Sequence, residues 1–124
     1  MAWFSREELK VGTILECGWN GMSDFYEVVG LSKKTIYLQE IDWETCPAPK
    51  GEEPSDPVHR WCRIKRDDKG KPIYVKDFNG RVPKATQKRL TEREDGKVKF
   101  NSPNYGGSGW VSISKSDYTE MYWD

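Results

Sequence analysis

The chain has 124 residues, of which 20 are Lys or Arg and 20 are Asp or Glu, so its formal net charge is zero. Only 35% of the residues are hydrophobic, but 6 Trp, 6 Tyr and 4 Phe supply enough ring surface to close the small core of one domain, residues 1–124. The zero net charge excludes a uniformly acidic DNA mimic and a uniformly basic protein that coats DNA.

The first residues predict a short helical turn. Ser5 and Glu8 have the spacing of a capping box, and Phe4 and Leu9 stand at the two positions of a hydrophobic staple. Gly12 ends this turn, because glycine interrupts a helix. We therefore expect one or two helical turns ahead of the first strand.

Three β-type segments follow the helical turn. Residues 11–17 and 24–30 are rich in β-branched and aromatic side chains, and a turn at Asn20-Gly21 separates them. Residues 35–41 form the third segment, after a turn at residues 32–34. The second and third segments together predict an antiparallel hairpin.

Residues 45–58 predict an exposed loop. They contain four prolines, at positions 47, 49, 54 and 57, and proline lacks the N–H that a central strand must donate. A loop of this length in a compact domain is either functional or mobile.

The second half of the chain contains further short strands separated by turns. Residues 59–66 alternate, and one face carries His59, Trp61 and Arg63. The remaining strand segments are 72–78, 87–93, 97–101 and 110–113. The tail, 114–124, fits a strand or a capped short helix. This spacing predicts a mainly β fold, a small antiparallel barrel of the SH3-like or OB-like kind with a short N-terminal helical turn.

The net charge of zero conceals a segregation along the chain. Residues 1–58 contain 5 basic and 11 acidic residues, residues 59–99 contain 14 basic and 6 acidic residues, and residues 100–124 contain 1 basic and 3 acidic residues. Two interpretations stay open. Either the segments interleave in the fold and their charges pair, or residues 59–99 form a basic face for an anionic partner.

The best candidate for a binding site is the basic strand around Trp61. Cations interleaved with an aromatic side chain suit phosphate groups and a stacked base. The candidate residues are Arg60, Trp61, Arg63, Lys65 and Arg66, joined by Lys88 and Arg89. The alternative is that Trp61 and Ile64 are core residues and that the cations protect a strand edge against aggregation.

Three further aromatic residues, Trp19, Tyr105 and Trp110, lie in or beside glycine-rich turns. Aromatic side chains on loops anchor protein partners, because they offer a large contact area and lose little rotamer entropy on binding. The alternative is that these rings cap the ends of the barrel. We therefore include all three as candidate binding residues.

Metal binding and catalysis are not expected. Cys17, Cys46, His59 and Cys62 are zinc-type ligands, but only His59 and Cys62 form a close pair in the sequence. These two residues face opposite sides of a strand, so they do not form a nucleophile and its base. No glycine-rich phosphate motif occurs. We expect no cofactor and no enzymatic activity.

The chain also predicts a cytoplasmic protein without a membrane partner. No apolar run approaches the roughly 20 residues of a membrane span. The N-terminus has neither the cationic start nor the apolar stretch of a secretory signal. Three cysteines without a C-x-x-C pair suit a reducing compartment better than a disulfide scaffold.

Part of the chain follows a pattern of a strand, a turn that starts with Trp, an Asp-Phe-Tyr-x-Val strand and a strand with Lys, Leu and Ile at fixed spacing. The residues that carry it are Val11–Ile14, Trp19, Asp24–Val29 and Lys34–Ile41, and more loosely Lys88–Leu90 and the aromatic tail. This pattern resembles that of a group of small uncharacterised proteins of phages and mobile elements. The chain departs from the group at Asn20, where the group has Gly, and at Gln39, where it has Arg.

The resemblance implies an origin in a phage or mobile element and a β fold, and it supplies no catalytic residues. The resulting hypothesis is a non-enzymatic accessory protein that binds a host protein or protein complex in the cytoplasm of a bacterial host. Inhibition of a host defence component is one form of that function. The alternative is a nucleic-acid or nucleotide-binding module that uses residues 59–99. The sequence specifies no oligomeric state.

Overall fold

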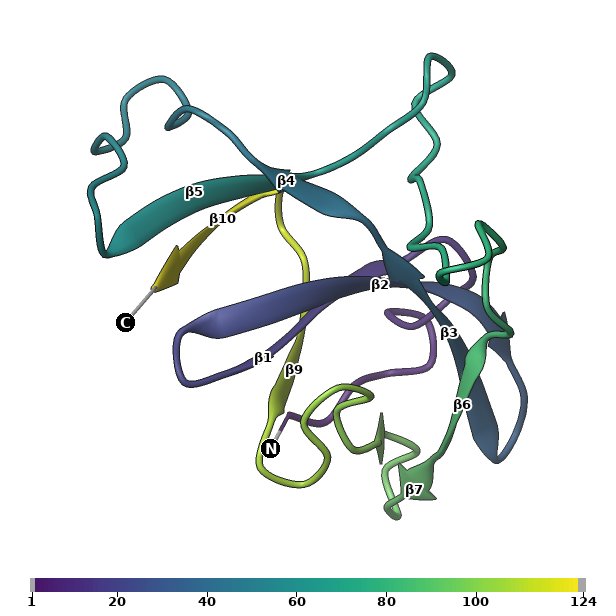
Figure 1. The fold of residues 1–124 in the computed structure, drawn as a ribbon. Coiled ribbons are helices and arrows are strands. Elements are labelled where there is room, and N and C mark those ends of the chain that lie inside the picture. Colours follow the sequence, from purple (N-terminus) through teal and green to yellow (C-terminus); the bar gives the residue numbers. More distant parts are fainter. Residues whose placement is uncertain (1, 123–124) are drawn as a thin grey trace.

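The computed structural model of the protein describes residues 2–122, and within them the chain forms ten strands and no helix (Figure 1). The strands are β1 Ile14–Trp19, β2 Met22–Leu31, β3 Thr35–Ile41, β4 Trp43–Thr45, β5 His59–Ile64, β6 Thr86–Arg89, β7 Thr91–Glu92, β8 Val98–Lys99, β9 Trp110–Ile113 and β10 Tyr118–Tyr122. In the described residues there is accordingly no helix long and apolar enough to cross a membrane.

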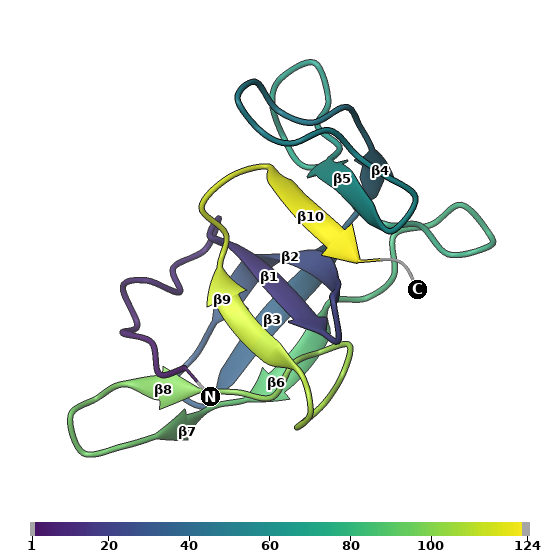
Figure 2. The same cartoon turned by 90° about the vertical axis from the view of Figure 1, so that its left-hand side faces the viewer.

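The strands are arranged in three antiparallel sheets (Figures 1 and 2). The strand order is β6-β3-β2-β1-β9 in the five-stranded sheet and β10-β5-β4 in the three-stranded sheet, and β7 pairs with β8. Asp42 alone separates β3 from β4, so one stretch of chain passes from the first sheet into the second.

The predicted mainly β, antiparallel fold is confirmed, but the prediction of a closed barrel is wrong. The chain connects β9 to β10 through four residues, 114–117. However, β10 pairs with β5 in the smaller sheet, and β9 stays at the edge of the larger one. The two sheets therefore form an open arrangement, because no strand ladder links β9 to β10 and closes the circle.

The turn at Asn20-Gly21 sets the register of the first hairpin. Asn20 and Gly21 have φ angles of 56° and 85°, and positive φ at both central residues is what a two-residue hairpin turn of type I′ requires. In the resulting register, Leu15 lies opposite Tyr26 and Cys17 lies opposite Asp24. Leu15 and Cys17 consequently face the same side of the sheet, and both are buried.

The buried side chains form two clusters on opposite faces of the five-stranded sheet. The first consists of Phe4, Leu9, Leu15, Cys17, Tyr26, Val28, Ile36, Leu38, Leu90, Val98, Phe100 and Val111. The second joins the two larger sheets and consists of Phe25, Ile41, Cys62, Ile64 and Met121. Neighbouring residues such as Phe25 and Tyr26 belong to different clusters, because successive side chains of a strand point to opposite faces.

The predicted N-terminal helical turn is not formed, although its sequence signals are present. The Ser5 amide donates to Glu8 Oε2 at 2.7 Å, and the Glu8 amide donates to Ser5 Oγ at 3.2 Å. Phe4 exchanges backbone hydrogen bonds with Val98, and the Gly12 amide donates to the Val28 carbonyl. These β-type contacts bound a segment too short to propagate a helix, so the residues between them form turns.

Two predicted strands in the second half are shorter than expected or missing. Residues 72–78 contribute only isolated bridges, Arg66 with Pro72 and Ile41 with Tyr74. The hairpin around Asp95-Gly96 is reduced to β7 and β8, of two residues each. The tail forms β10, which ends at Tyr122, and the last two residues of the predicted tail segment lie outside the described residues.

Candidate functional site

Three cations within or after β5, Arg63, Lys65 and Arg66, lie against acidic side chains from other parts of the chain. Arg63 Nε is 3.2 Å from Glu44 Oε2, and Lys65 Nζ is 3.1 Å from Asp42 Oδ2. Hydrogen bonds to the side chains of Tyr118 and Glu44 raise the pKa of the Arg63 guanidinium. Both cations therefore take part in pairs that link β5 to the β3–β4 segment.

Arg66 makes the best-aligned pair of this region. Its Nε and Nη2 lie 2.7 and 2.9 Å from the two carboxylate oxygens of Asp117, and its Nη1 donates to the Gly70 carbonyl at 2.6 Å. The hydrogen bond to Asp117 raises the pKa of Arg66. The two-pronged geometry is the one that guanidinium and carboxylate groups favour, so Arg66 ties the turn after β5 to the residue before β10.

Trp61 is half-buried and holds the proline-rich loop. Its indole Nε1 donates to the Glu53 carbonyl at 2.9 Å, and its backbone amide donates to Ser55 Oγ at 3.1 Å. Arg60 is exposed and borders a shallow depression with Trp61, Thr45 and other residues of this loop. The polar edge of the indole is thus already engaged by the loop.

Lys88 and Arg89 lie in a different part of the molecule. They belong to β6, which pairs with β3 in the five-stranded sheet, with Lys88 opposite Ile36 and Arg89 opposite Thr35. Figure 2 shows β6 and β7 at the end of the molecule remote from β4 and β5. The cations selected from the sequence therefore do not share one face.

Two of the candidate loop aromatics surround the turn of the first hairpin. Trp19 and Trp110 are 49% and 43% exposed. Trp110 lies opposite Gly18 in the β1–β9 pair, and a Cβ added at Gly18 would be only 2.6 Å from Trp110 Cζ2. The absence of a side chain at Gly18 is what lets the indole pack on the strand.

Tyr122 adds a third ring to the same turn. It is 42% exposed, its amide donates to the Gly21 carbonyl at 2.9 Å, and a Cβ at Gly21 would lie 2.7 Å from Tyr122 Cβ. The His59 ring stands edge-on to the Tyr122 ring, with 4.9 Å between centroids. We call Trp19, Trp110, Tyr122 and His59 the aromatic rim.

Tyr105 does not belong to the aromatic rim. It is half-buried in the loop before β9, and burial together with the nearby Asp24 carboxylate raises its pKa. The adjacent Asn104 donates to the Cys17 carbonyl at 3.1 Å and to Asp24 Oδ2 at 3.0 Å, which fastens this loop to β1 and β2. The surroundings of Tyr105 are thus those of a loop anchor.

Sequence reasoning did not select Tyr122 and His59 as members of one surface. Their meeting depends on the β5–β10 pairing, which places Tyr122 opposite His59. The aromatic residues of the tail were the only local signal, and the strand that pairs with them cannot be read from their spacing.

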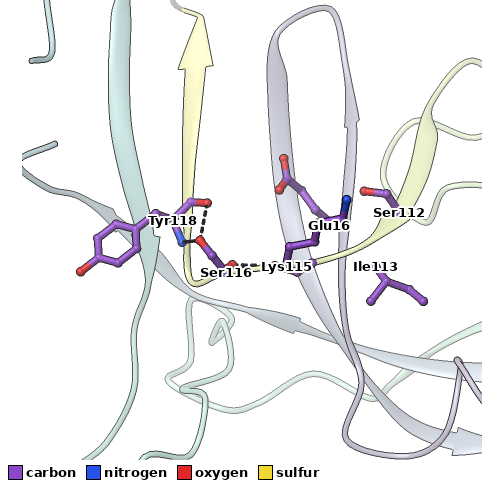
Figure 3. Close-up of a pocket in the computed structure, with 7 residues that line it drawn as sticks. Glu16, Ser112, Ile113, Lys115, Ser116 and Tyr118 are labelled. Carbon is purple, nitrogen blue, oxygen red and sulfur yellow. Dashed lines mark hydrogen bonds between the residues drawn. The ribbon is translucent and has the colours of Figure 1, made fainter. Parts of the chain in front are cut away.

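A cleft of about 330 Å³ lies between the two larger sheets, beside β9 and β10 (Figure 3). Glu16 borders this cleft, and its Oε2 accepts hydrogen bonds from Ser23 Oγ and Thr119 Oγ1, both at 2.9 Å. Two of the serine hydroxyls at its rim also have partners: Ser114 donates to the Ser116 carbonyl, and Ser116 Oγ accepts from the Tyr118 amide. These contacts fasten β10 to the larger sheet, and the Glu16 carboxylate holds the hydroxyls of Ser23 and Thr119.

Among the described residues, the zinc-type side chains do not converge on one site. Cys17 belongs to the first buried cluster and Cys62 to the second. Burial raises the pKa of the Cys17 thiol far above its usual value and that of Cys62 to about 11. In residues 2–122, no group of three or more His, Cys, Asp or Glu side chains is placed to hold a metal ion. Buried thiols with raised pKa values are poor nucleophiles, because the thiolate is the reactive form.

No protein-family model, curated protein or solved structure matches this chain. The described surfaces therefore define a class only, an open antiparallel β protein with exposed aromatic residues around one hairpin turn.

Proposed function

We propose that the protein is a non-enzymatic binding protein that docks onto a host protein through the aromatic rim. One observation carries this proposal: Trp19, Trp110 and Tyr122 are each between 42% and 49% exposed, although Trp110 and Tyr122 pack on Gly18 and Gly21 of the first hairpin. Trp and Tyr are the residue types that dominate binding energy at protein interfaces. An accessory protein of a phage or mobile element that inhibits a host factor fits this mode of binding.

The contacts of Trp110 and Tyr122 with the first hairpin favour binding, because they fix these two rings before a partner arrives. Trp110 packs on Gly18, and Tyr122 packs on Gly21. Side chains that are already ordered lose less conformational entropy on binding than free ones do. The rim therefore offers apolar area at a low entropic cost, as preorganised interfaces do.

The chemistry of the remaining candidates supports binding over catalysis. The Cys17 and Cys62 thiols are buried with raised pKa values, and the Ser114 and Ser116 hydroxyls that border the cleft beside β10 are engaged by backbone groups. Ser23, whose hydroxyl donates to the Glu16 carboxylate, is buried. A nucleophilic mechanism needs a nucleophile within hydrogen-bond reach of a base. The exposed rings need no such arrangement.

The proposal is tested by affinity capture from bacterial lysate with the immobilised protein and three variants, Trp19→Ala, Trp110→Ala and Val11→Ala. The wild type and Val11→Ala, whose exposed apolar residue lies at the N-terminal turns, should retain one partner at equal stoichiometry. Trp110→Ala should lose at least about 2 kcal/mol of binding, roughly a 30-fold weaker affinity, as central aromatic residues do. Failure to recover a stoichiometric partner, or equal capture by all variants, overturns the proposal.

A further inference from the structure

A second surface lies at the corner where β6, β7 and the end of β8 meet. A depression of about 230 Å³ at this corner is lined by Lys88, Arg89, Thr91, Lys99, Phe100 and Asn101, which we call the cationic corner. Half of these side chains are cations and none is an acid. The Thr91 hydroxyl and the Asn101 amide add neutral hydrogen-bond donors.

The cations of this corner have no acidic partner. Within residues 2–122, carboxylates form ion pairs with Arg6, His59, Arg63, Lys65, Arg66 and Arg93 but with none of the cations in the depression. Basic residues that border one depression attract anions when no carboxylate neutralises them. The corner is therefore electrostatically suited to an anion.

Well-defined strands hold the three cations. Lys88 and Arg89 are fixed by the β3–β6 ladder. Lys99 belongs to β8, and its Nζ lies 4.7 Å from the centroid of a Trp3 ring. Phe100, next to Lys99, is 3% exposed and belongs to the first buried cluster. The charges thus project from a packed part of the molecule, which favours a built site over a chance gathering of surface lysines.

The volume of the depression and the hydrogen-bond donors around it indicate which ligand fits. The depression is smaller than the ~300–1,000 Å³ of a typical small-molecule site, so it accommodates one phosphate group while the rest of the ligand stays outside. Arg binds phosphate oxygens through two parallel N–H groups, and Lys adds a point charge. Lys34, which also lacks an ion pair among the described residues, adjoins Thr35, the partner of Arg89. A further cation at that place suits a second phosphate.

We infer that the cationic corner binds the phosphate of a nucleotide, within a single nucleic-acid strand or free. Lys88, Arg89 and Lys99 hold this phosphate, and the Thr91 and Asn101 side chains donate to its remaining oxygens. This inference is independent of the aromatic rim, because Figure 1 shows the β1–β2 turn and β6–β7 on opposite sides of the five-stranded sheet. It also adds Lys99, Thr91 and Asn101, which the sequence analysis did not select, and it excludes the strand around Trp61 from the site.

The test measures fluorescence anisotropy of a labelled 12-residue oligothymidylate with the full chain at low salt. The variant Lys88→Gln/Arg89→Gln should bind at least about tenfold more weakly than the wild type, and its affinity should fall less steeply with salt, because fewer counterions are released. The matched control Arg63→Gln/Lys65→Gln removes two charges from ion pairs and should bind within about twofold of the wild type. Melting temperatures of the corner variant and the wild type should agree.

Competition identifies the source of the phosphate. Displacement by unlabelled oligothymidylate alone assigns the site to a strand, and equal displacement by thymidine monophosphate assigns it to the free nucleotide; both support the inference. Absence of binding at low salt, an affinity independent of salt, or equal loss in the corner variant and the control overturns it. Trp110→Ala should keep the oligonucleotide affinity, so a failure here is distinguishable from a failure of the aromatic rim.

Discussion

The strand β5 and the cationic corner come from the same basic segment, residues 59–99, yet the structure uses their charges differently. Arg63, Lys65 and Arg66 after or within β5 each face a carboxylate. Lys88 and Arg89 in β6 face none among the described residues. The comparison shows that the number of cations in a segment does not reveal whether they are available to a ligand.

The difference arises from the neighbours of each strand. β5 lies between β4 and β10, and these two strands come from the acidic first and last segments of the chain. β6 lies at the edge of the larger sheet, and its neighbour β3 offers Ile36 and Thr35 opposite its cations. The interpretation that the charges of the segments pair is therefore met at β5, whereas the cations of the corner have no ion pair among the described residues.

The largest expected effect on stability comes from weakening the packing between the two larger sheets. Met121 is fully buried between the two larger sheets, so Met121→Ala should lower the free energy of unfolding by about 2–5 kcal/mol. Urea denaturation measures this loss, with the exposed neighbour Glu120→Ala as control. The affinity for the oligonucleotide, measured at a temperature where the variant is folded, should not change. The cationic corner lies beside the first buried cluster, to which Phe100 belongs, whereas Met121 belongs to the second. A loss below about 1 kcal/mol would contradict the packing described here.

A smaller effect is expected when the loop over β5 is released. Trp61→Phe keeps the ring but removes the N–H that donates to the Glu53 carbonyl, which should cost about 1 kcal/mol of stability. Limited proteolysis should then cut residues 46–58 faster than in the wild type. Trp110→Phe, which leaves this loop untouched, should not change the cleavage rate. Equal cleavage of both variants would show that the indole does not hold the loop.

The coupling energy of the Arg66–Asp117 ion pair measures how much the paired cations near β5 stabilise the fold. Their side chains are 34% and 39% exposed, so solvent screens the interaction and the coupling energy should be about 0.5–1 kcal/mol. A double-mutant cycle of Arg66→Ala and Asp117→Ala, followed by urea denaturation, isolates it. Lys88→Ala should leave the stability unchanged within about 0.5 kcal/mol. A coupling energy of zero would show that the Arg66–Asp117 pair does not stabilise the fold, and would contradict the contrast between paired cations near β5 and unpaired cations at the corner.

The smallest expected effect concerns acid pH. The hydrogen bond from Arg93 and that from the Lys97 amide lower the pKa of Asp95. A carboxyl group with a lowered folded pKa stabilises the fold above its unfolded pKa of about 3.9, and this contribution is lost as the pH falls through the folded pKa. Asp95→Asn should therefore lose less stability than the wild type between about pH 5 and pH 2.5. Identical pH profiles from chemical denaturation would contradict this assignment.

Local signals predicted the parts of the fold that depend on neighbouring residues. The β-forming side chains of residues 24–30 and 35–41 predicted an antiparallel hairpin, and the pairing of β2 with β3 confirms it, because a short turn brings its own two strands together. The helical turn at residues 5–9 failed although its reciprocal hydrogen bonds exist. The bridge from Phe4 to Val98, 94 positions away in sequence, overrides a local helix signal there.

The candidate site residues also fall into those that the sequence selected and those that only the structure revealed. The sequence alone selected the exposed aromatic residues Trp19 and Trp110 and the cations Lys88 and Arg89, because residue type and flanking glycines are local properties. It could not bring Tyr122 to His59 or Lys99 to Arg89, since each meeting depends on long-range contacts. It also grouped Arg63 and Lys65 with Lys88, whereas the structure places Arg63 in β5 of the three-stranded sheet, Lys65 directly after it, and Lys88 in β6 of the five-stranded sheet.

The sequence by itself determined the β class, the hairpin of β2 and β3, and the presence of a basic segment between acidic ends. Only the tertiary structure decided that β10 pairs with β5 and leaves the barrel open, and which cations lie beside carboxylates. The physical reason is that propensity and turn geometry act over a few residues, whereas a charge is neutralised by whatever the sheet places within a few ångströms of it. Strand pairing, and not composition, therefore determines which cations of this protein remain available to a ligand.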